Sequence, residues 1–166
     1  REFDHKTGIG YPTLVTGYLG FENPNKYKFY NRGISGNRVI DVYARIKEDI
    51  INLKPNVMSI LIGVNDVWHE INYKNGVDAE KYFKIYSMLI EEVLKELPDI
   101  KIIILEPFLL KASATEENWD HFRGEVEKRA AKAKEIAEKY NLTFISLQDK
   151  FDEAAKTAPP SYWLID

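Results

Sequence analysis

The amino-acid sequence predicts an α/β fold with one parallel sheet flanked by helices. Apolar runs rich in branched residues lie at residues 57–62, 101–105 and 142–147, and amphipathic segments of helical length separate them. A continuous apolar run is typical of a strand that is buried on both faces, as in a parallel sheet. Strands that alternate with helices form βαβ units, whose right-handed crossovers place helices on both faces of the sheet.

Length and composition are those of one globular domain covering residues 1–166. The chain is 45% hydrophobic and 30% charged, has a net charge of −3 and contains no cysteine. It is long enough for a sizeable core. The small net charge without a Lys/Arg-rich block argues against nucleic acid or a membrane as partner. The absence of cysteine excludes disulfides, a thiol nucleophile and Cys-based metal sites. The absence of cysteine does not fix the compartment, although we favour the cytoplasm over secretion. A homo-oligomer is possible.

The first third of the chain predicts a helix, a strand and a second helix. A proline near the start and a glycine beyond the end delimit a helix over residues 11–19. A strand is expected at residues 27–31, followed by a loop with two glycines. Apolar residues then recur at helical spacing over residues 39–52, which predicts a helix there.

The rest of the chain alternates the remaining strands with helices. The strand at residues 57–62 stops at a glycine, and the polar segment 69–77 is expected to be a loop. Asp78 is a suitable N-cap for a long helix that ends near Leu97. The remaining predicted elements are a strand at 101–105, a helix over about 116–140, a strand at 142–147 and a helix over about 149–156.

Chemically distinctive residues follow three of the predicted strands. Residues 31–37 read Asn-Arg-Gly-Ile-Ser-Gly-Asn, residues 63–66 read Gly-Val-Asn-Asp, and residues 106–108 read Glu-Pro-Phe. Ligands of open α/β sheets bind beyond the carboxyl ends of strands, so these loops are expected to converge there. A backbone N–H of the glycine loop and the side-chain amide of Asn65 make one form of oxyanion hole. The alternative is that residues 63–66 are only a turn, which Gly, Asn and Asp favour for backbone reasons.

These motifs resemble those of the SGNH (GDSL) hydrolase family. Residues 31–37 resemble its second conserved block and residues 63–66 its third. Residues 163–166, Trp-Leu-Ile-Asp, resemble the lead-in to its last block, Asp-x-x-His. The order and spacing agree over nearly the whole chain. The resemblance implies a flavodoxin-like three-layer α/β/α fold with strand order 2-1-3-4-5. It also implies ester hydrolysis by a Ser-His-Asp triad, without a cofactor.

The resemblance further implies roles for three residues. Gly36 would donate its backbone N–H and Asn65 its side-chain N–H to the oxyanion, and Asp166 would orient the triad histidine. The nucleophile block Gly-Asp-Ser-[Leu/Ile], the final histidine and the first strand of the family are not found within residues 1–166. We therefore expect that the sequence is cut at both ends and that these segments lie just outside it.

Three further residues are candidates for substrate binding. Ser35 lies in Gly-Ile-Ser-Gly-Asn, a near miss to Gly-x-Ser-x-Gly. A bond to its own backbone is favoured over a role as nucleophile. Trp68 is either a stacking platform for a sugar or acyl group, or a packing residue under a neighbouring loop or in a subunit contact. His69 follows at the same rim. The histidines lack the partner spacing of a metal site, so no metal is predicted.

Within the family, the Gly-x-Asn-Asp-Val-Trp form of the third block most resembles bacterial esterases that remove acetyl groups from xylan-type oligosaccharides. We therefore expect a serine esterase whose partner is a small-molecule or oligosaccharide ester. A lysophospholipase- or thioesterase-like hydrolase is the alternative enzyme. A non-catalytic glycan-binding or scaffold module that lost the triad is the other alternative, because no Ser-His pair is apparent in the residues given.

Overall fold

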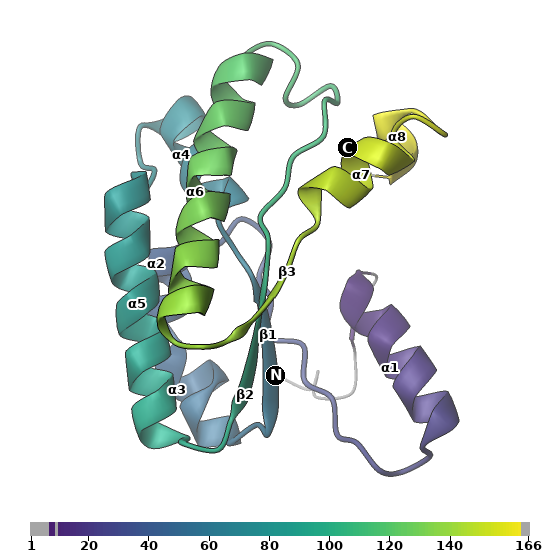
Figure 1. The fold of residues 1–166 in the computed structure, drawn as a ribbon, viewed down its shortest axis with the longest axis vertical. Helices are drawn as coiled ribbons and strands as arrows, with labels where there is room; N and C mark the ends of the chain where they lie inside the picture. The colour runs from purple at the N-terminus through teal and green to yellow at the C-terminus, as the bar shows by residue number, and fades with distance from the viewer. Residues whose placement is uncertain (1–6, 9, 164–166) are drawn as a thin grey trace. The chain divides into compact units, whose positions relative to one another are not determined.

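The computed structural model describes residues 7–8 and 10–163 (Figure 1). The chain falls into two compact units, Arg1–Ser35 and Gly36–Asp166, and each is described by itself. Within the described part, no helix combines the length and the apolar character that crossing a membrane requires.

The first unit contains helix α1, Tyr11–Glu22. The helix begins after Gly10 with a proline in its first turn, as predicted, but it continues past Gly20. A glycine in a helix interior costs only about 1 kcal/mol relative to alanine, which is not enough to end a helix by itself. The predicted end at residue 19 is therefore three residues short.

Residues 27–31 do not form the predicted strand. A strand pairs its backbone N–H and C=O groups with a neighbouring strand, and no described residue pairs with this segment. The loop that follows is held locally. Asn31 donates from Nδ2 to the carbonyl oxygen of Thr7 at 2.8 Å, and its Oδ1 accepts from the N–H of Gly33 at 3.0 Å. The Gly33 N–H is thereby used within the loop.

The second unit is built on a parallel sheet of three strands: β1 (Val57–Leu61), β2 (Lys101–Leu105) and β3 (Thr143–Ile145). The spatial order is β1-β2-β3, and the first residues of β1 and β2 lie opposite each other. The predicted parallel α/β fold is confirmed. Neighbouring strands are also consecutive in the chain, as the last three strands of a 2-1-3-4-5 order are.

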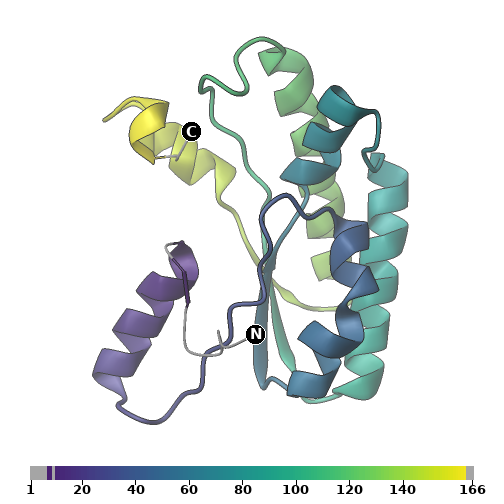
Figure 2. The same ribbon diagram turned by 180° about the vertical axis from the view of Figure 1, so that it is seen from behind.

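Helices precede the first strand and follow each of the three. They are α2 (Val39–Ala44), α3 (Ile46–Asp49), the 3-10 helix η1 (Ile51–Leu53), α4 (Val64–Tyr73), α5 (Ala79–Glu96), α6 (Trp119–Lys139), α7 (Gln148–Ala154) and α8 (Pro160–Trp163). In this unit α5 and α6 lie side by side, α2 packs against α5, and α6 contacts β2 and β3 (Figures 1 and 2). The main core lies between these helices and the sheet. Its fully buried side chains include Tyr82, Tyr86, Leu89, Ile90, Ile104 and Ile136.

In the second unit, the helix predicted over residues 39–52 and the loop predicted at 69–77 are corrected, and the predicted start of the helix after Asp78 is confirmed. The continuous helix expected over residues 39–52 is divided into α2, α3 and η1. Much of the loop expected at residues 69–77 is the second half of α4. Helix α5 begins at the predicted N-cap, because the Asp78 carboxylate accepts a hydrogen bond from the N–H of Lys81 at 2.8 Å.

Candidate active site

The carboxyl end of β1 is connected to α4 by a turn that only glycine fits well. Gly63 has φ +137°, a conformation that L side chains rarely adopt. A Cβ at this position would lie 3.0 Å from the side chain of Pro107 and 3.3 Å from the hydroxyl of Tyr82. That hydroxyl donates to the carbonyl oxygen of Ile62 at 3.0 Å. The end of β1 is thus held tightly against its neighbours, and α4 starts from a defined position.

Asn65 and Asp66 belong to the first turn of α4 and not to an irregular rim loop. The first N–H groups of a helix lack partners within the helix, and the aligned peptide dipoles give this end a partial positive charge. Asn65 is half-buried, whereas Asp66 is wholly buried. The site therefore combines a helix N-terminus with a carboxamide, an arrangement suited to an anion.

The turn at Gly36 lies next to Asn65. Gly36 adopts φ +82° in a turn, and within the described residues its N–H makes no hydrogen bond. Asn65 donates from Nδ2 to the carbonyl oxygen of Asn37 at 3.2 Å. A carboxamide NH₂ carries two hydrogens, so this bond orients the group and leaves one donor available. The structure thus shows the Asn65 amide hydrogen-bonded to Asn37, the residue that directly follows Gly36.

Asp66 connects the same two segments from inside the protein. Its carboxylate oxygens accept from the backbone N–H of Val39, at 3.1 Å to Oδ1 and 3.2 Å to Oδ2. Nothing in the sequence pattern indicated this partner on α2. Burial raises the pKa of Asp66 to about 7, against the lowering effects of the Val39 hydrogen bond and of the charges of Arg129 and Arg38.

This raised pKa predicts a pH-dependent stability. Between pH 4 and 7 the folded state retains a proton on Asp66 that the unfolded chain, with its ordinary pKa near 3.9, has lost. The contribution of Asp66 to the free energy of unfolding is complete below pH 4 and is lost as the pH rises to 7, by up to about 4 kcal/mol. Asp66→Asn cannot titrate, so its stability relative to wild type is expected to rise over this range. Urea unfolding of both proteins from pH 4 to 8 measures the difference, and parallel pH curves would contradict it.

The substrate-binding candidates occupy different positions. Trp68 is half-buried and packs on Phe122, with ring centroids 5.7 Å apart, beside the second cluster of buried residues Val67, Leu109, Phe122 and Val126. This contact agrees with the packing alternative for that side chain. His69 lies one helical turn after Asn65, with its ring edge-on to Tyr73 at 5.5 Å. Ser35 is exposed at the end of the first unit. Asp166 lies outside the described residues. Their roles stay predictions.

Two polar residues hold the loop after β2: Glu106, which belongs to the distinctive motif at residues 106–108, and Gln148, which was not predicted. Gln148 pairs with the backbone of Leu109, accepting its N–H at Oε1 and donating from Nε2 to its carbonyl oxygen, both at 2.9 Å. The Glu106 carboxylate accepts from the N–H groups of Leu147 and Gln148 at 2.6 and 2.9 Å. Glu106 therefore caps the start of α7, a structural role. In the sequence, a Gln in the first turn of a short helix gave no signal of this pairing.

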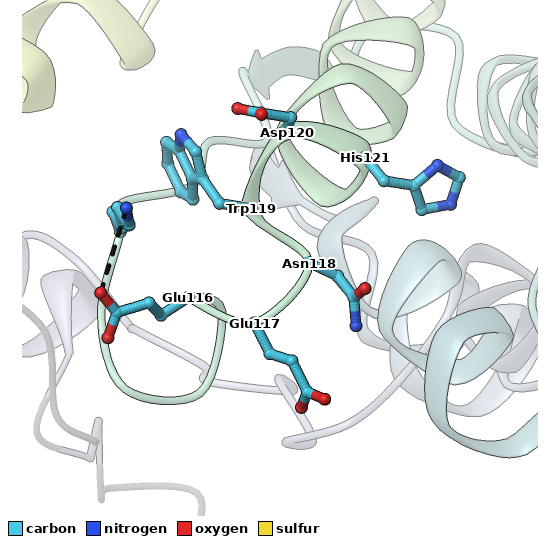
Figure 3. Close-up of a pocket in the computed structure, with 7 residues that line it drawn as sticks. Glu116, Glu117, Asn118, Trp119, Asp120 and His121 are labelled. Atoms are coloured by element: carbon cyan, nitrogen blue, oxygen red, sulfur yellow. Dashed lines mark ion pairs between the residues drawn. The ribbon is translucent and has the colours of Figure 1, made fainter.

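A shallow hollow at the start of α6 is lined by other residues. They are Lys111, Glu116, Glu117, Asn118, Trp119, Asp120 and His121 (Figure 3). Lys111 and Glu116 form an ion pair at 4.0 Å, and most of the lining side chains are exposed. None of the predicted site residues contributes to this hollow, so we do not place the chemistry there.

Comparison with known proteins agrees with the motifs. Residues 4–166 match the GDSL-like lipase/acylhydrolase family. An acetylxylan esterase of Geobacillus stearothermophilus is 34% identical over 157 residues, which cover 93% of this chain and 70% of that protein.

Solved structures give the same result. A protein of Parabacteroides merdae ATCC 43184, described as a GDSL-like lipase, has a TM-score of 0.84 and 36% identity, covering 94% of this chain and 72% of its own. A catalytic mutant of the Geobacillus esterase, with an aspartate replaced by alanine, has a TM-score of 0.82 and 34% identity over 93% of this chain and 70% of its own.

Proposed function

This chain belongs to the GDSL-like lipase/acylhydrolase family of serine ester hydrolases, and from that premise we propose that it deacetylates carbohydrates by a Ser-His-Asp mechanism. The serine and the histidine are those of the family's Gly-Asp-Ser-[Leu/Ile] and Asp-x-x-His blocks. Gly36 and Asn65 bind the oxyanion, and Asp166 orients the histidine.

One observation carries the proposal: the hydrogen bond from Asn65 Nδ2 to the carbonyl oxygen of Asn37. It holds the amide beside the Gly36 turn, at the positive end of α4. In the proposal, two donors of different origin, the Gly36 backbone N–H and the Asn65 side-chain amide, bind one oxygen. Such an arrangement stabilises the charge that develops on a carbonyl oxygen when an ester is attacked.

The chemistry proceeds in two halves. The serine hydroxyl attacks the acetyl carbonyl while the histidine removes its proton, and the oxyanion forms between Gly36 and Asn65. The C–O bond to the sugar breaks as the histidine returns the proton to the departing hydroxyl. Water, activated by the same histidine, then releases acetate from the serine. The carboxylate of Asp166 keeps the imidazole in the tautomer that accepts the serine proton.

The carbohydrate as leaving group is supported by two features. The 34%-identical relative is an acetylxylan esterase. In this chain, His69 is placed one turn after Asn65 on α4, and Trp68 is only half-buried. In this proposal, His69 contacts the sugar that carries the acetyl group, and so does the exposed part of Trp68 that does not pack on Phe122.

A labelling experiment tests the proposal in the full-length protein. We expect a fluorophosphonate probe to modify one serine stoichiometrically and to abolish acetate release from acetylated xylo-oligosaccharides. The kcat/KM for these esters is expected to exceed the kcat/KM for lysophospholipids and for acyl thioesters, each measured over the same range of substrate concentrations. Absence of labelling would favour the non-catalytic module, and labelling with a preference for lysophospholipids or thioesters would overturn the carbohydrate substrate.

A further inference from the structure

We propose that Asp66 is a positioning residue that sets the spacing between the two oxyanion donors, Gly36 and Asn65. The inference rests on the proposed esterase function, because it concerns the same site. Asp66 is not placed to touch the substrate, since none of its surface is exposed. It acts through the two segments that carry the donors.

The first step in the argument is the buried link between α4 and α2. Asp66 directly follows Asn65, and Val39 lies three residues after Gly36. Both carboxylate oxygens of Asp66 accept from the Val39 N–H, at 3.1 and 3.2 Å. Val39 is also wholly buried. Water therefore does not compete for this hydrogen bond, so it is a stable link between the first turns of α4 and α2.

A second link joins the same segments at a neighbouring point. Asn65 Nδ2 donates to the carbonyl oxygen of Asn37 at 3.2 Å. Two adjacent residues of α4 thus hold two points of a three-residue stretch that begins directly after Gly36. A single hydrogen bond permits rotation about itself, whereas two bonds at separate points restrict both rotation and sliding. The Asp66 link consequently decides where the Gly36 N–H lies relative to the Asn65 amide.

The first turn of α4 is also held from its other side. The carbonyl oxygen of Asp66 accepts from the Val77 N–H at 3.0 Å, and the carbonyl oxygen of Val77 accepts from Nη2 of Arg129 at 2.7 Å. Arg129 is only 3% exposed and pairs with Glu125 on α6. Asp66 is therefore anchored to the body of the unit, while its carboxylate holds the segment that follows the Gly36 turn.

An oxyanion hole is sensitive to such placement in a characteristic way. The donors act on the charge of the transition state and little on the neutral ester, so misplacement lowers kcat more than it raises KM. A misplacement of 1 Å can cost about 100-fold in rate. A purely structural role of Asp66 would instead lower the melting temperature and the fraction of active protein, without changing kcat per active site.

The test uses the full-length enzyme with 4-nitrophenyl acetate as substrate. Titration with a fluorophosphonate gives the concentration of active sites, so that kcat is expressed per active site. We expect Asp66→Ala to lower kcat per active site by about 10- to 100-fold, with KM within about threefold of wild type. Asp66→Asn retains an oxygen that accepts the Val39 N–H, so it is expected to restore most of the loss. In an Asn65→Ala background, Asp66→Ala is expected to have little further effect, because the spacing between the two donors no longer matters once one of them is removed.

Two further variants separate the link from general destabilisation. Ile136→Ala removes a buried side chain near the C-terminal end of α6. It is expected to lower the melting temperature but to leave kcat per active site unchanged. If Asp66→Ala does not fold, Val39→Pro is the second test, because it removes the donor of the link and replaces the buried valine side chain with another small apolar one. Proline is tolerated at the first position of a helix, and Arg38 before it has the extended conformation that proline requires. Its kcat is expected to fall as in Asp66→Ala.

The outcomes distinguish this inference from the function on which it rests. If Asn65→Ala lowers kcat but Asp66→Ala or Val39→Pro does not, the positioning role is wrong and the oxyanion assignment stands. An undiminished effect of Asp66→Ala in the Asn65→Ala background overturns the positioning role as well. If Asn65→Ala itself leaves kcat unchanged, the oxyanion assignment fails and the role of Asp66 fails with it.

Discussion

Asn65→Ala in the full-length enzyme is expected to lower kcat by about 10²–10³ and to change KM little. The substitution removes the amide hydrogen that is left over when the other hydrogen bonds Asn37. The loss concerns the transition state, in which the carbonyl oxygen becomes charged, and affects the neutral substrate much less. Initial rates with 4-nitrophenyl acetate and with an acetylated xylo-oligosaccharide, over a range of concentrations, separate kcat from KM.

The same helix provides a matched control for this variant. Asn72 lies two turns after Asn65 on α4 and donates from Nδ2 to the carbonyl oxygen of Trp68 at 3.1 Å, in an exposed position. Asn72→Ala is expected to keep wild-type turnover. Asn65→Asp retains the size of the side chain but replaces the donor with a carboxylate, and we expect it to be at least as impaired as Asn65→Ala. Near-normal turnover in both Asn65 variants would rule out the oxyanion role.

The largest effect is expected for Asp166→Asn, a loss of about 10⁴ in kcat. An amide at this position donates where the carboxylate accepts, so the histidine is held in the tautomer that cannot take the serine proton. The assignment comes from the match of residues 163–166 to the lead-in of the last family block.

A pH–rate profile measures this prediction. Asp149, in the first turn of α7, is an exposed carboxylate near the same end of the chain. Asp149→Asn is expected to retain the wild-type profile. Asp166→Asn is expected to lose turnover throughout the neutral range while it still folds, as judged by its melting curve. A folded Asp166→Asn protein with turnover like that of Asp149→Asn would contradict a triad role.

The regular elements of the sheet were largely determined by local sequence. The apolar runs at residues 57–62 and 101–105 gave β1 and β2 nearly to the residue, because strands that pack against helices need apolar side chains along their length. The N-cap of α5 was likewise readable, since Asp78 bonds a group only three residues away. The glycine and asparagine motifs also identified the family, because their chemistry depends on residue type and order.

Elements that depend on contacts with distant parts of the chain were not predicted correctly from the local sequence. The segment of α4 mixes apolar residues with helix-disfavouring Asn and Asp, and its helix packs where Val67 and Trp68 meet Phe122 of α6. Conversely, residues 27–31 look like a strand but have no strand partner among the described residues. Tertiary contacts decide such cases, because propensity alone is a weak preference.

The candidate site shows the same division. The sequence by itself determined which donors are proposed, the Gly36 N–H and the Asn65 amide, and that Asn65 follows the carboxyl end of a strand. Only the tertiary structure decided that Asp66 would be buried against Val39, which lies 27 residues earlier in the chain. A buried carboxylate must find a hydrogen-bond donor, but which donor it finds depends on how the chain folds back on itself.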